Sequence, residues 1–295
     1  MKSRKTTWPI AVKTLCIPVY ILFSFILTLL NTQNLNAMEA HQTDHSNMKL
    51  GKSPAVHDPR TLLMANYLTP DALPPTPAKY IYAKNIPATG WGMMANDKIG
   101  DCTCAAAGHL IMEWTDDNGA LVTPSDQDII NAYSSITGYD PATGKNDNGA
   151  VETNVLNYWR KTGIAGHKIM AYASLEPKNE THIKLGTFLF GGCYIGVSLP
   201  LTAQTQKVWS VPPGGATGRG APGSWGGHAV CVVGYDSHGL TIITWGATKK
   251  MTWSFWNAYC DEAYAIISTD FAGAKTAPSG FDLAALQADL KLIVA

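Results

Sequence analysis

"NDKIGDCTCAAAGHLIMEW", residues 96–114, sets two cysteines one residue apart, between a glycine-containing turn and a run of helix-forming residues. Apolar residues recur at helical spacing, so the stretch predicts a helix over 102–114 that begins at Cys102. The unpaired N–H groups of a helix's first turn favour a thiolate there. Cys104 points about 200° away around the helix, which favours a core position. This position makes a nucleophile one possible role of Cys102, beside a metal clip, a disulfide or a small core residue.

Two other interpretations of this stretch fail on spacing. A Cys-x-Cys metal clip needs at least two further ligands nearby, and the remaining cysteines and histidines are scattered along the chain. His109 cannot activate Cys102, because seven residues of helix separate the two by about 10 Å, far beyond hydrogen-bond reach. The sequence predicts no metal site and no cofactor.

The flanking regions divide into a helical part and a later β part. Helices are predicted over 102–114, 125–135 and 151–162, and an amphipathic helix over 281–295. Short β-branched and aromatic runs bounded by turns predict strands at 186–199, 228–235, 240–245 and 263–268. Helices first and strands later indicate the α+β class.

The second chemical signal is "HAVCVVGYD", residues 228–236, in which a histidine opens an apolar strand. Together with the cysteine stretch, it makes residues 80–270 resemble the papain-like cysteine peptidases. The catalytic histidine of that superfamily opens a strand with a His-Ala-Val…Val-Gly-Tyr pattern, roughly 130 residues after the cysteine. His228 follows Cys102 by 126 residues.

Further blocks carry the same resemblance. An amide side chain precedes the family's cysteine by six residues through a glycine turn, and Asn96 precedes Cys102 in this way, with Gly100 between them. "IITWG" (242–246) falls where the family has a strand ending Asn-Ser-Trp-Gly, and "DEAYAII" (261–267) falls where it has a Gly-Tyr strand.

The resemblance implies both a fold and a reaction. A helical half that carries Cys102 at a helix N-terminus would pack against an antiparallel sheet or barrel half that carries His228. Cys102 is then the nucleophile, His228 the general base and acid, and Asn96 an oxyanion donor. The implied enzyme is a thiol hydrolase that cleaves peptide or isopeptide bonds of a peptide or protein substrate through an acyl-enzyme, without a cofactor.

Departures from the family pattern keep other functions open. Ile243 stands where the family has its histidine-orienting asparagine, so Thr244 and Asp236 are the candidate orienting groups. Asp101, just before the thiol, is interpreted as a helix cap that also places a negative charge beside it. One alternative is a catalytically impaired papain-fold module that binds or inhibits. Another is an envelope amidase or acyl transferase directed at peptidoglycan.

A glycine-rich segment leads into the histidine. Residues 211–227 contain seven glycines and three prolines, which fits either a mobile rim of the active site or a surface insertion. Trp225 at its end, together with Trp209, Trp245 and Gly100, is expected to line the cleft. By the resemblance, Trp245 would shield the histidine.

Composition and the first residues indicate export. Lys+Arg and Asp+Glu both number 22, so there is no basic excess of the kind that nucleic-acid binding proteins show. Residues 1–37 have the charged start, apolar run and small exit residue of a secretory signal, with cleavage near Ala37. We expect a secreted or periplasmic protein without membrane association after cleavage. An uncleaved N-terminal anchor is the alternative.

The rest of the chain is divided by composition. Residues 38–80 are polar and proline-rich, which predicts a flexible, exposed arm, within which His45 is interpreted as solvated. The arm is also a candidate pro-segment that covers the cleft. Residues 81–270 form the predicted catalytic domain and 271–295 a helical tail. Beside Cys102, the cysteines either form two disulfides or are all free thiols: Cys104, Cys193, Cys231 and Cys260.

Overall fold

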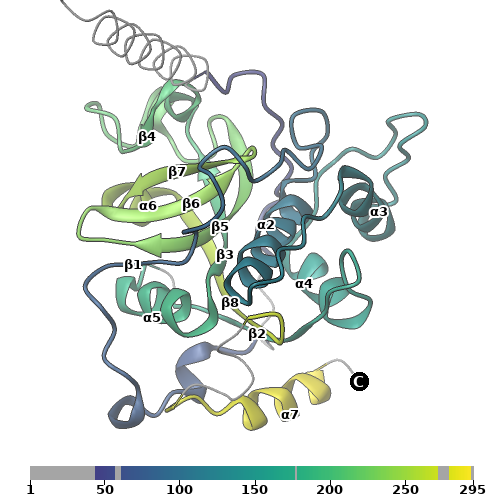
Figure 1. The fold of residues 1–295 in the computed structure, drawn as a ribbon. Helices are drawn as coiled ribbons and strands as arrows, with labels where there is room; N and C mark the ends of the chain where they lie inside the picture. The colour runs from purple at the N-terminus through teal and green to yellow at the C-terminus, as the bar shows by residue number, and fades with distance from the viewer. Residues whose placement is uncertain (1–43, 57–60, 177, 272–278, 294–295) are drawn as a thin grey trace, which may run out of the picture. The chain divides into compact units, whose positions relative to one another are not determined.

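The structure is a computed structural model that describes residues 44–56, 61–176, 178–271 and 279–293 (Figure 1). The predicted signal peptide, residues 1–37, lies outside these residues. No helix among the described residues has both the length and the apolar character needed to cross a membrane.

The helical part consists of three helices at the positions that the sequence predicts. They are α2 (Cys102–Asp117), α3 (Asp126–Thr137) and α4 (Glu152–Lys161). Ser125 forms a capping box with Asp128 at the start of α3, and Gly138 in the left-handed conformation ends that helix. The three helices pack on one another beside the sheet (Figure 1).

The β part is one sheet with strand order β2-β8-β3-β5-β6-β7-β4, and β1 pairs with β5. The predicted strands 228–235, 240–245 and 263–268 correspond to β5, β6 and β8. The pairs β3–β5, β3–β8, β5–β6 and β6–β7 are antiparallel. The α+β class is confirmed. The strands are β1 (Tyr80–Ile81), β2 (Ile169–Ser174), β3 (Cys193–Leu199), β4 (Val208–Trp209), β5 (Gly226–Tyr235), β6 (Gly239–Thr244), β7 (Ala247–Thr252) and β8 (Cys260–Ser268).

One predicted strand is partly wrong. The range 186–199 begins inside a helix, α5 (Glu180–Phe190), and only its second half is strand β3. The Asn179 side chain caps α5 at its start, and Gly191, with φ 73°, ends it. The apolar run before Gly191 therefore completes an amphipathic helix. Strands β2 and β7 and helix α6 (Trp253–Tyr259) also form where the sequence analysis predicted no element.

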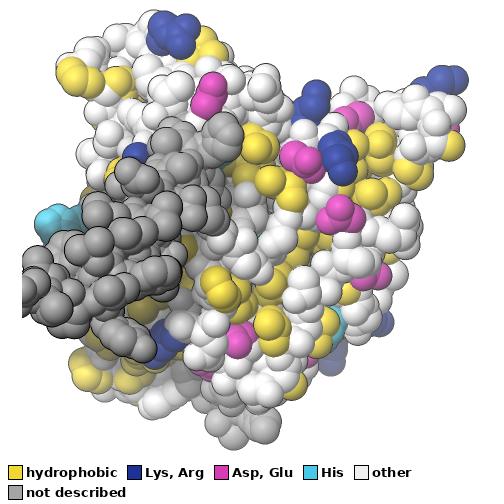
Figure 2. Space-filling view, turned by 45° about the horizontal axis from the view of Figure 1, so that its top comes forward, with side chains coloured by type: hydrophobic (Ala, Val, Ile, Leu, Met, Phe, Trp, Pro, Cys, Tyr) yellow, Lys and Arg dark blue, Asp and Glu magenta, His cyan; other side chains and the backbone are white. Residues whose placement is uncertain are grey.

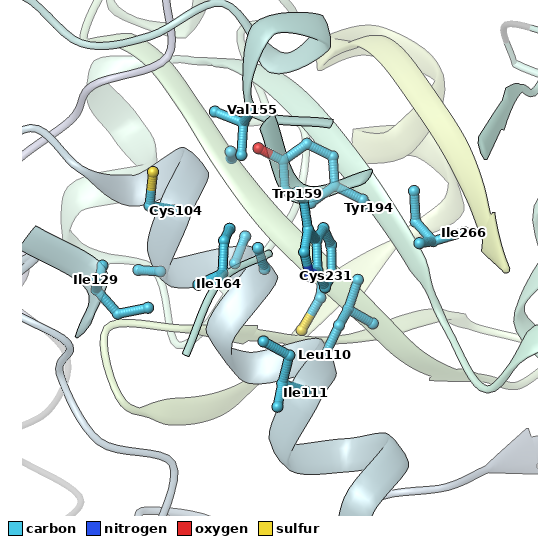
Figure 3. Packing of buried hydrophobic residues seen from close by; sticks show 14 of the residues in the cluster. Cys104, Leu110, Ile111, Ile129, Val155, Trp159, Ile164, Tyr194, Cys231 and Ile266 are labelled. Atoms are coloured by element: carbon cyan, nitrogen blue, oxygen red, sulfur yellow. The ribbon is translucent and has the colours of Figure 1, made fainter. Parts of the chain in front are cut away.

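Helix α2 holds the two parts together, because nearly all of its side chains are buried. Leu110 and Ile111 of α2 lie among Trp159 of α4 and Cys231 of β5 (Figure 3). Cys104 is fully buried in the same cluster, which confirms its predicted core position. The five cysteines of the described residues, Cys102, Cys104, Cys193, Cys231 and Cys260, are free thiols.

The segment before the catalytic domain is not the exposed flexible arm that its composition suggests. Its described residues pack on the domain, and Met64 and Tyr67 of a short 3₁₀ helix are buried. The Tyr67 hydroxyl donates to Asp289 at 2.8 Å, on the C-terminal helix α7 (Leu283–Ile293). The helix predicted for the tail is thus confirmed, and it lies against the chain's own N-terminal segment.

Candidate active site

Packing of α2 against β5 brings the two predicted catalytic residues together. Cys102 is the first residue of α2, and its sulfur accepts a hydrogen bond from the backbone N–H of Ala229 at 3.4 Å. Ala229 directly follows His228 near the start of β5. A thiol at the open end of a helix therefore meets the histidine's strand, although most of the catalytic domain separates the two in sequence.

His228 is held on one side by a hydroxyl group. Its Nε2 atom lies 2.8 Å from Oγ1 of Thr244, the last residue of β6. The Nδ1 atom is buried and has no hydrogen-bond partner among the described residues. Thr244 thus fixes the ring through Nε2 and leaves Nδ1 as the nitrogen available to the thiol.

Tryptophans enclose the imidazole. Trp245 stacks on His228 with ring centroids 4.4 Å apart, and Trp209 meets it edge-on at 6.5 Å. Trp225 packs on the indole of Trp245 at 5.6 Å. The tryptophans expected at the cleft therefore lie around the histidine, and they exclude water from it.

Asp236, the other candidate for orienting the histidine, lies elsewhere. It follows the far end of β5, where its carboxylate binds the Lys250 ammonium at 2.8 Å and accepts from the N–H of His238. That carboxylate belongs to the turn between β5 and β6. The orienting contact of His228 comes from Thr244.

The turn before Cys102 differs in part from expectation. The Asn96 amide donates to the carbonyl of Ile99 at 3.2 Å, and Gly100 N–H donates to Asp147 at 2.9 Å. Asp101 occupies the N-cap position of α2 but makes no capping hydrogen bond. The expected cap is therefore absent. Burial raises the pKa of Asp101 to about 8, and its negative charge, where present, raises the pKa of the Cys102 thiol as expected.

Residues 44–56, which we call the cleft segment, occupy the site. Gly51 accepts from Ala150 N–H at 2.8 Å, and Lys52 N–H donates to the Gly227 carbonyl at 3.1 Å. The carbonyl of Lys49 accepts from the Trp245 indole at 3.3 Å. His45, predicted to be solvated, is buried and stacks on Trp245 at 4.9 Å. The segment, purple in Figure 1, passes between α2 and the sheet.

Glycines allow the cleft segment to pass very close to the backbone of the domain. A Cβ atom on Gly51 would collide with the backbone of Gly100, and one on Gly149 or Gly227 would collide with the cleft segment. Gly149 has φ 75°, a conformation that favours glycine in any case. The sequence analysis singled out Gly100 but missed Gly149 and Gly227 as parts of the same slot.

Burial keeps the candidate catalytic pair uncharged. Burial raises the pKa of Cys102 to about 12, against the weaker opposing effect of hydrogen bonds from the N–H groups of Ala229 and Gly51. Burial, with smaller contributions from His45 and His109, lowers the pKa of His228 to about 3. At neutral pH this arrangement contains a thiol and a neutral imidazole, and not the ion pair that attacks a carbonyl.

Known structures share this arrangement of elements. Xylellain, a cysteine protease from Xylella fastidiosa, superimposes with a TM-score of 0.58 at 15% identity, over 76% of this chain and 97% of its own. The chain has the papain-like fold. Procathepsin B S9 from Trypanosoma congolense matches with a TM-score of 0.55 at 12% identity, over 76% of this chain and 88% of its own.

A third structure joins the protease domain to another domain. The cysteine protease and lectin-like domains of Cwp84, a surface layer associated protein of Clostridium difficile, match with a TM-score of 0.51 at 11% identity, over 79% of this chain and 59% of theirs. No family model and no curated protein matches the sequence. At these identities the likeness establishes the fold, and function has to be argued from the site.

In a chain whose cleft segment has been displaced, replacing Thr244 by Val should lower kcat for peptide hydrolysis by about 10- to 100-fold, because the imidazole loses the group that orients it at nearly constant side-chain volume. KM should change little, since Thr244 is buried against the histidine. The Thr241→Val variant, three residues earlier on β6 and likewise buried, is the matched control. Equal kcat in the Thr244→Val and Thr241→Val variants would remove Thr244 from the site.

Proposed function

We propose that the chain is an exported thiol hydrolase that cleaves peptide or isopeptide bonds with Cys102 as nucleophile and His228 as base and acid. One observation carries this proposal. The Cys102 sulfur at the start of α2 lies 3.4 Å from the backbone nitrogen of Ala229, the residue after His228, and the His228 ring is held by Thr244. No group of three His, Cys, Asp or Glu side chains in the described part of the chain is arranged to bind a metal ion.

In this proposal His228 Nδ1 takes the thiol proton, and the thiolate attacks the substrate's carbonyl carbon. The oxyanion is stabilised by the Cys102 N–H at the open end of α2, and Asn96 in the preceding turn is the second candidate donor. His228 then returns the proton to the leaving amine, which leaves an acyl group on sulfur. Water hydrolyses the thioester and regenerates the thiol.

We also propose that the cleft segment is an inhibitory pro-segment. The sulfur faces the N–H of Gly51, and the Gly51 carbonyl is held by Ala150 N–H. The segment thus presents a donor to the nucleophile in place of an electrophilic carbon. It binds as a ligand and resists cleavage, and it must leave before a substrate can enter.

Gly51→Ala in the full chain tests the function and the inhibition together. The added methyl group collides with the Gly100 backbone, so the cleft segment is displaced and Cys102 becomes accessible. We expect hydrolysis of a denatured protein and alkylation of Cys102 to increase at least about tenfold over wild type. In wild type the open state, in which the cleft segment has left the site, is disfavoured by about 1.4 kcal/mol or more, and in the variant it becomes the main state. Peptide release and mass spectrometry measure the two effects.

The matched control is Gly214→Ala, because a methyl group at Gly214 meets no atom within 4 Å. Adding Cys102→Ala to Gly51→Ala should abolish hydrolysis. Fast alkylation without hydrolysis of any peptide or protein would favour the binding module over the hydrolase. Equal alkylation of wild type and the Gly51→Ala variant would contradict the inhibitory role of the segment.

A further inference from the structure

One residue of the cleft segment enters a pocket with acidic walls. The Lys52 ammonium lies 3.1 Å from Asp261 and 2.9 Å from Glu262, and its side chain is 1% exposed. Burial alone would lower the pKa of Lys52, but the attraction of Glu152, Glu262 and Asp261 outweighs burial and raises it. A lysine is therefore held there as a cation, away from solvent.

The walls of the pocket belong to the domain and not to the segment. Glu152 begins α4, while Asp261 and Glu262 lie on β8. The Ser198 hydroxyl donates to Asp261 at 2.7 Å, and the Tyr264 hydroxyl donates to Glu262 at 2.8 Å. Because these hydroxyls fix two of the carboxylates, the acidic walls persist when Lys52 leaves.

A glycine makes the space. A Cβ atom on Gly196 of β3 would collide with the Lys52 side chain and lie 2.8 Å from a Glu152 carboxylate oxygen. Gly196 is the partner of Glu262 in the β3–β8 register. Only a residue without a side chain at this point leaves a channel between the strand and α4 that a long, straight side chain can fill.

The pocket opens beside the nucleophile. Lys52 follows Gly51, whose backbone N–H is close enough to the Cys102 thiol to lower its pKa against the larger effect of burial. The Lys52 backbone lies between Ala150, with which it forms a parallel bridge, and Gly227. The pocket therefore receives the side chain of Lys52, the residue next to Gly51, which lies beside the Cys102 sulfur.

We propose that this pocket selects substrates with Lys or Arg at the position next to the residue whose carbonyl is attacked, and that Lys52 holds the segment in place by imitating that side chain. The inference rests on the proposed hydrolase function. An apolar side chain in the pocket would leave the carboxylates of Asp261 and Glu262 without a counter-charge, which penalises a wrong occupant.

The experiment uses the full chain carrying Gly51→Ala. Fluorogenic peptide amides are varied one position at a time among Lys, Arg, Leu and norleucine, a neutral residue as long as lysine without its charge. At one position Lys and Arg should give kcat/KM at least about tenfold above norleucine, as expected for a charge buried beside its counter-charges. Glu262→Gln should reduce that ratio, and Glu176→Gln, at an exposed site, should leave it unchanged.

A binding measurement separates failure of the pocket from failure of the hydrolase. A labelled peptide of residues 46–56 should bind the Gly51→Ala chain, and norleucine in place of Lys52 should weaken its affinity at least about tenfold. Hydrolysis with equal or preferred cleavage at Leu would overturn the pocket and leave the hydrolase standing. Lysine-dependent peptide binding without hydrolysis would support the pocket and overturn the hydrolase.

Discussion

Replacing His228 by Ala in the Gly51→Ala chain should lower peptide hydrolysis by about 10³-fold or more and abolish the rapid alkylation of Cys102 near neutral pH. The imidazole both removes the thiol proton and supplies the proton to the leaving amine, so two steps lose their catalyst. The remaining thiol would react only through the small thiolate fraction of an unassisted cysteine, with a pKa of about 8.5. Initial rates with a fluorogenic peptide and with iodoacetamide measure both effects.

His238→Ala is the matched control, because His238 is exposed in the turn after β5 and its backbone N–H makes the bond to Asp236. It should leave both rates unchanged. Comparable rates in the His228→Ala and His238→Ala chains would mean that Cys102 works without a histidine partner. The 3.4 Å contact between Cys102 and Ala229 would then be packing alone.

Lys52→Met should open the wild-type cleft without any change in Gly51. Removal of the ammonium leaves the carboxylates of Asp261 and Glu262 without their counter-charge in the closed state, whereas water can enter the pocket in the open state. Breaking a buried ion pair costs about 3–5 kcal/mol, which corresponds to a rise of about 100-fold or more in the open population. The rate of Cys102 alkylation should rise by the same factor as long as opening and closing of the cleft segment are faster than the alkylation step.

Lys49→Met is the control for this change, because Lys49 lies in the same segment with an exposed side chain and contributes its backbone carbonyl to Trp245. Its alkylation rate should equal that of wild type. If Lys52→Met alkylates no faster than Lys49→Met, the acidic pocket does not hold the segment in place.

The fold class and the closeness of Cys102 to the strand of His228 could be predicted because their signals are local. A cysteine that opens a helix and a histidine that opens an apolar strand are each visible within about ten residues. Thr244 was among the predicted orienting groups because it follows the family's position by one residue. Asp236 was not distinguished from it, since only the pairing of β5 with β6 shows that Asp236 lies at the opposite end of the strand.

The sequence offered residues 38–80 as a candidate pro-segment, but the contacts of the cleft segment could not be predicted because its partners come from distant parts of the chain. Lys52 is polar and next to glycine, serine and proline, so its composition indicates an exposed arm. Its three acidic partners come from α4 and β8, and the slot for Gly51 and Lys52 is formed by Gly100, Gly149 and Gly227, which are far apart in the sequence. Burial of polar residues by such partners leaves no periodic pattern in the sequence.

The predicted strand 186–199 failed for a local reason. Three apolar residues in a row before Gly191 fit a helix end and a strand equally well. Asn179, which caps α5 through the His182 N–H at 3.1 Å, decides for the helix. The cap lies outside the apolar run on which the prediction rested.

The charge on the face shown in Figure 2 agrees with a peptide-directed function. Its Lys and Arg side chains are scattered among acidic and apolar ones and form no continuous basic patch there. Together with the zero net charge, this gives no support for a nucleic-acid partner.

Two claims are tested most directly by the pH dependence of Cys102 alkylation in wild type and in the Gly51→Ala chain. These are the pairing of Cys102 with His228 and the covering of that pair by the cleft segment. In the closed protein burial raises the pKa of Cys102 to about 12, so wild type should react slowly throughout pH 5–8. The opened chain should react rapidly over that range, and His228→Ala should remove this rapid phase. Identical slow profiles in all three chains would contradict both the dyad and the inhibitory segment.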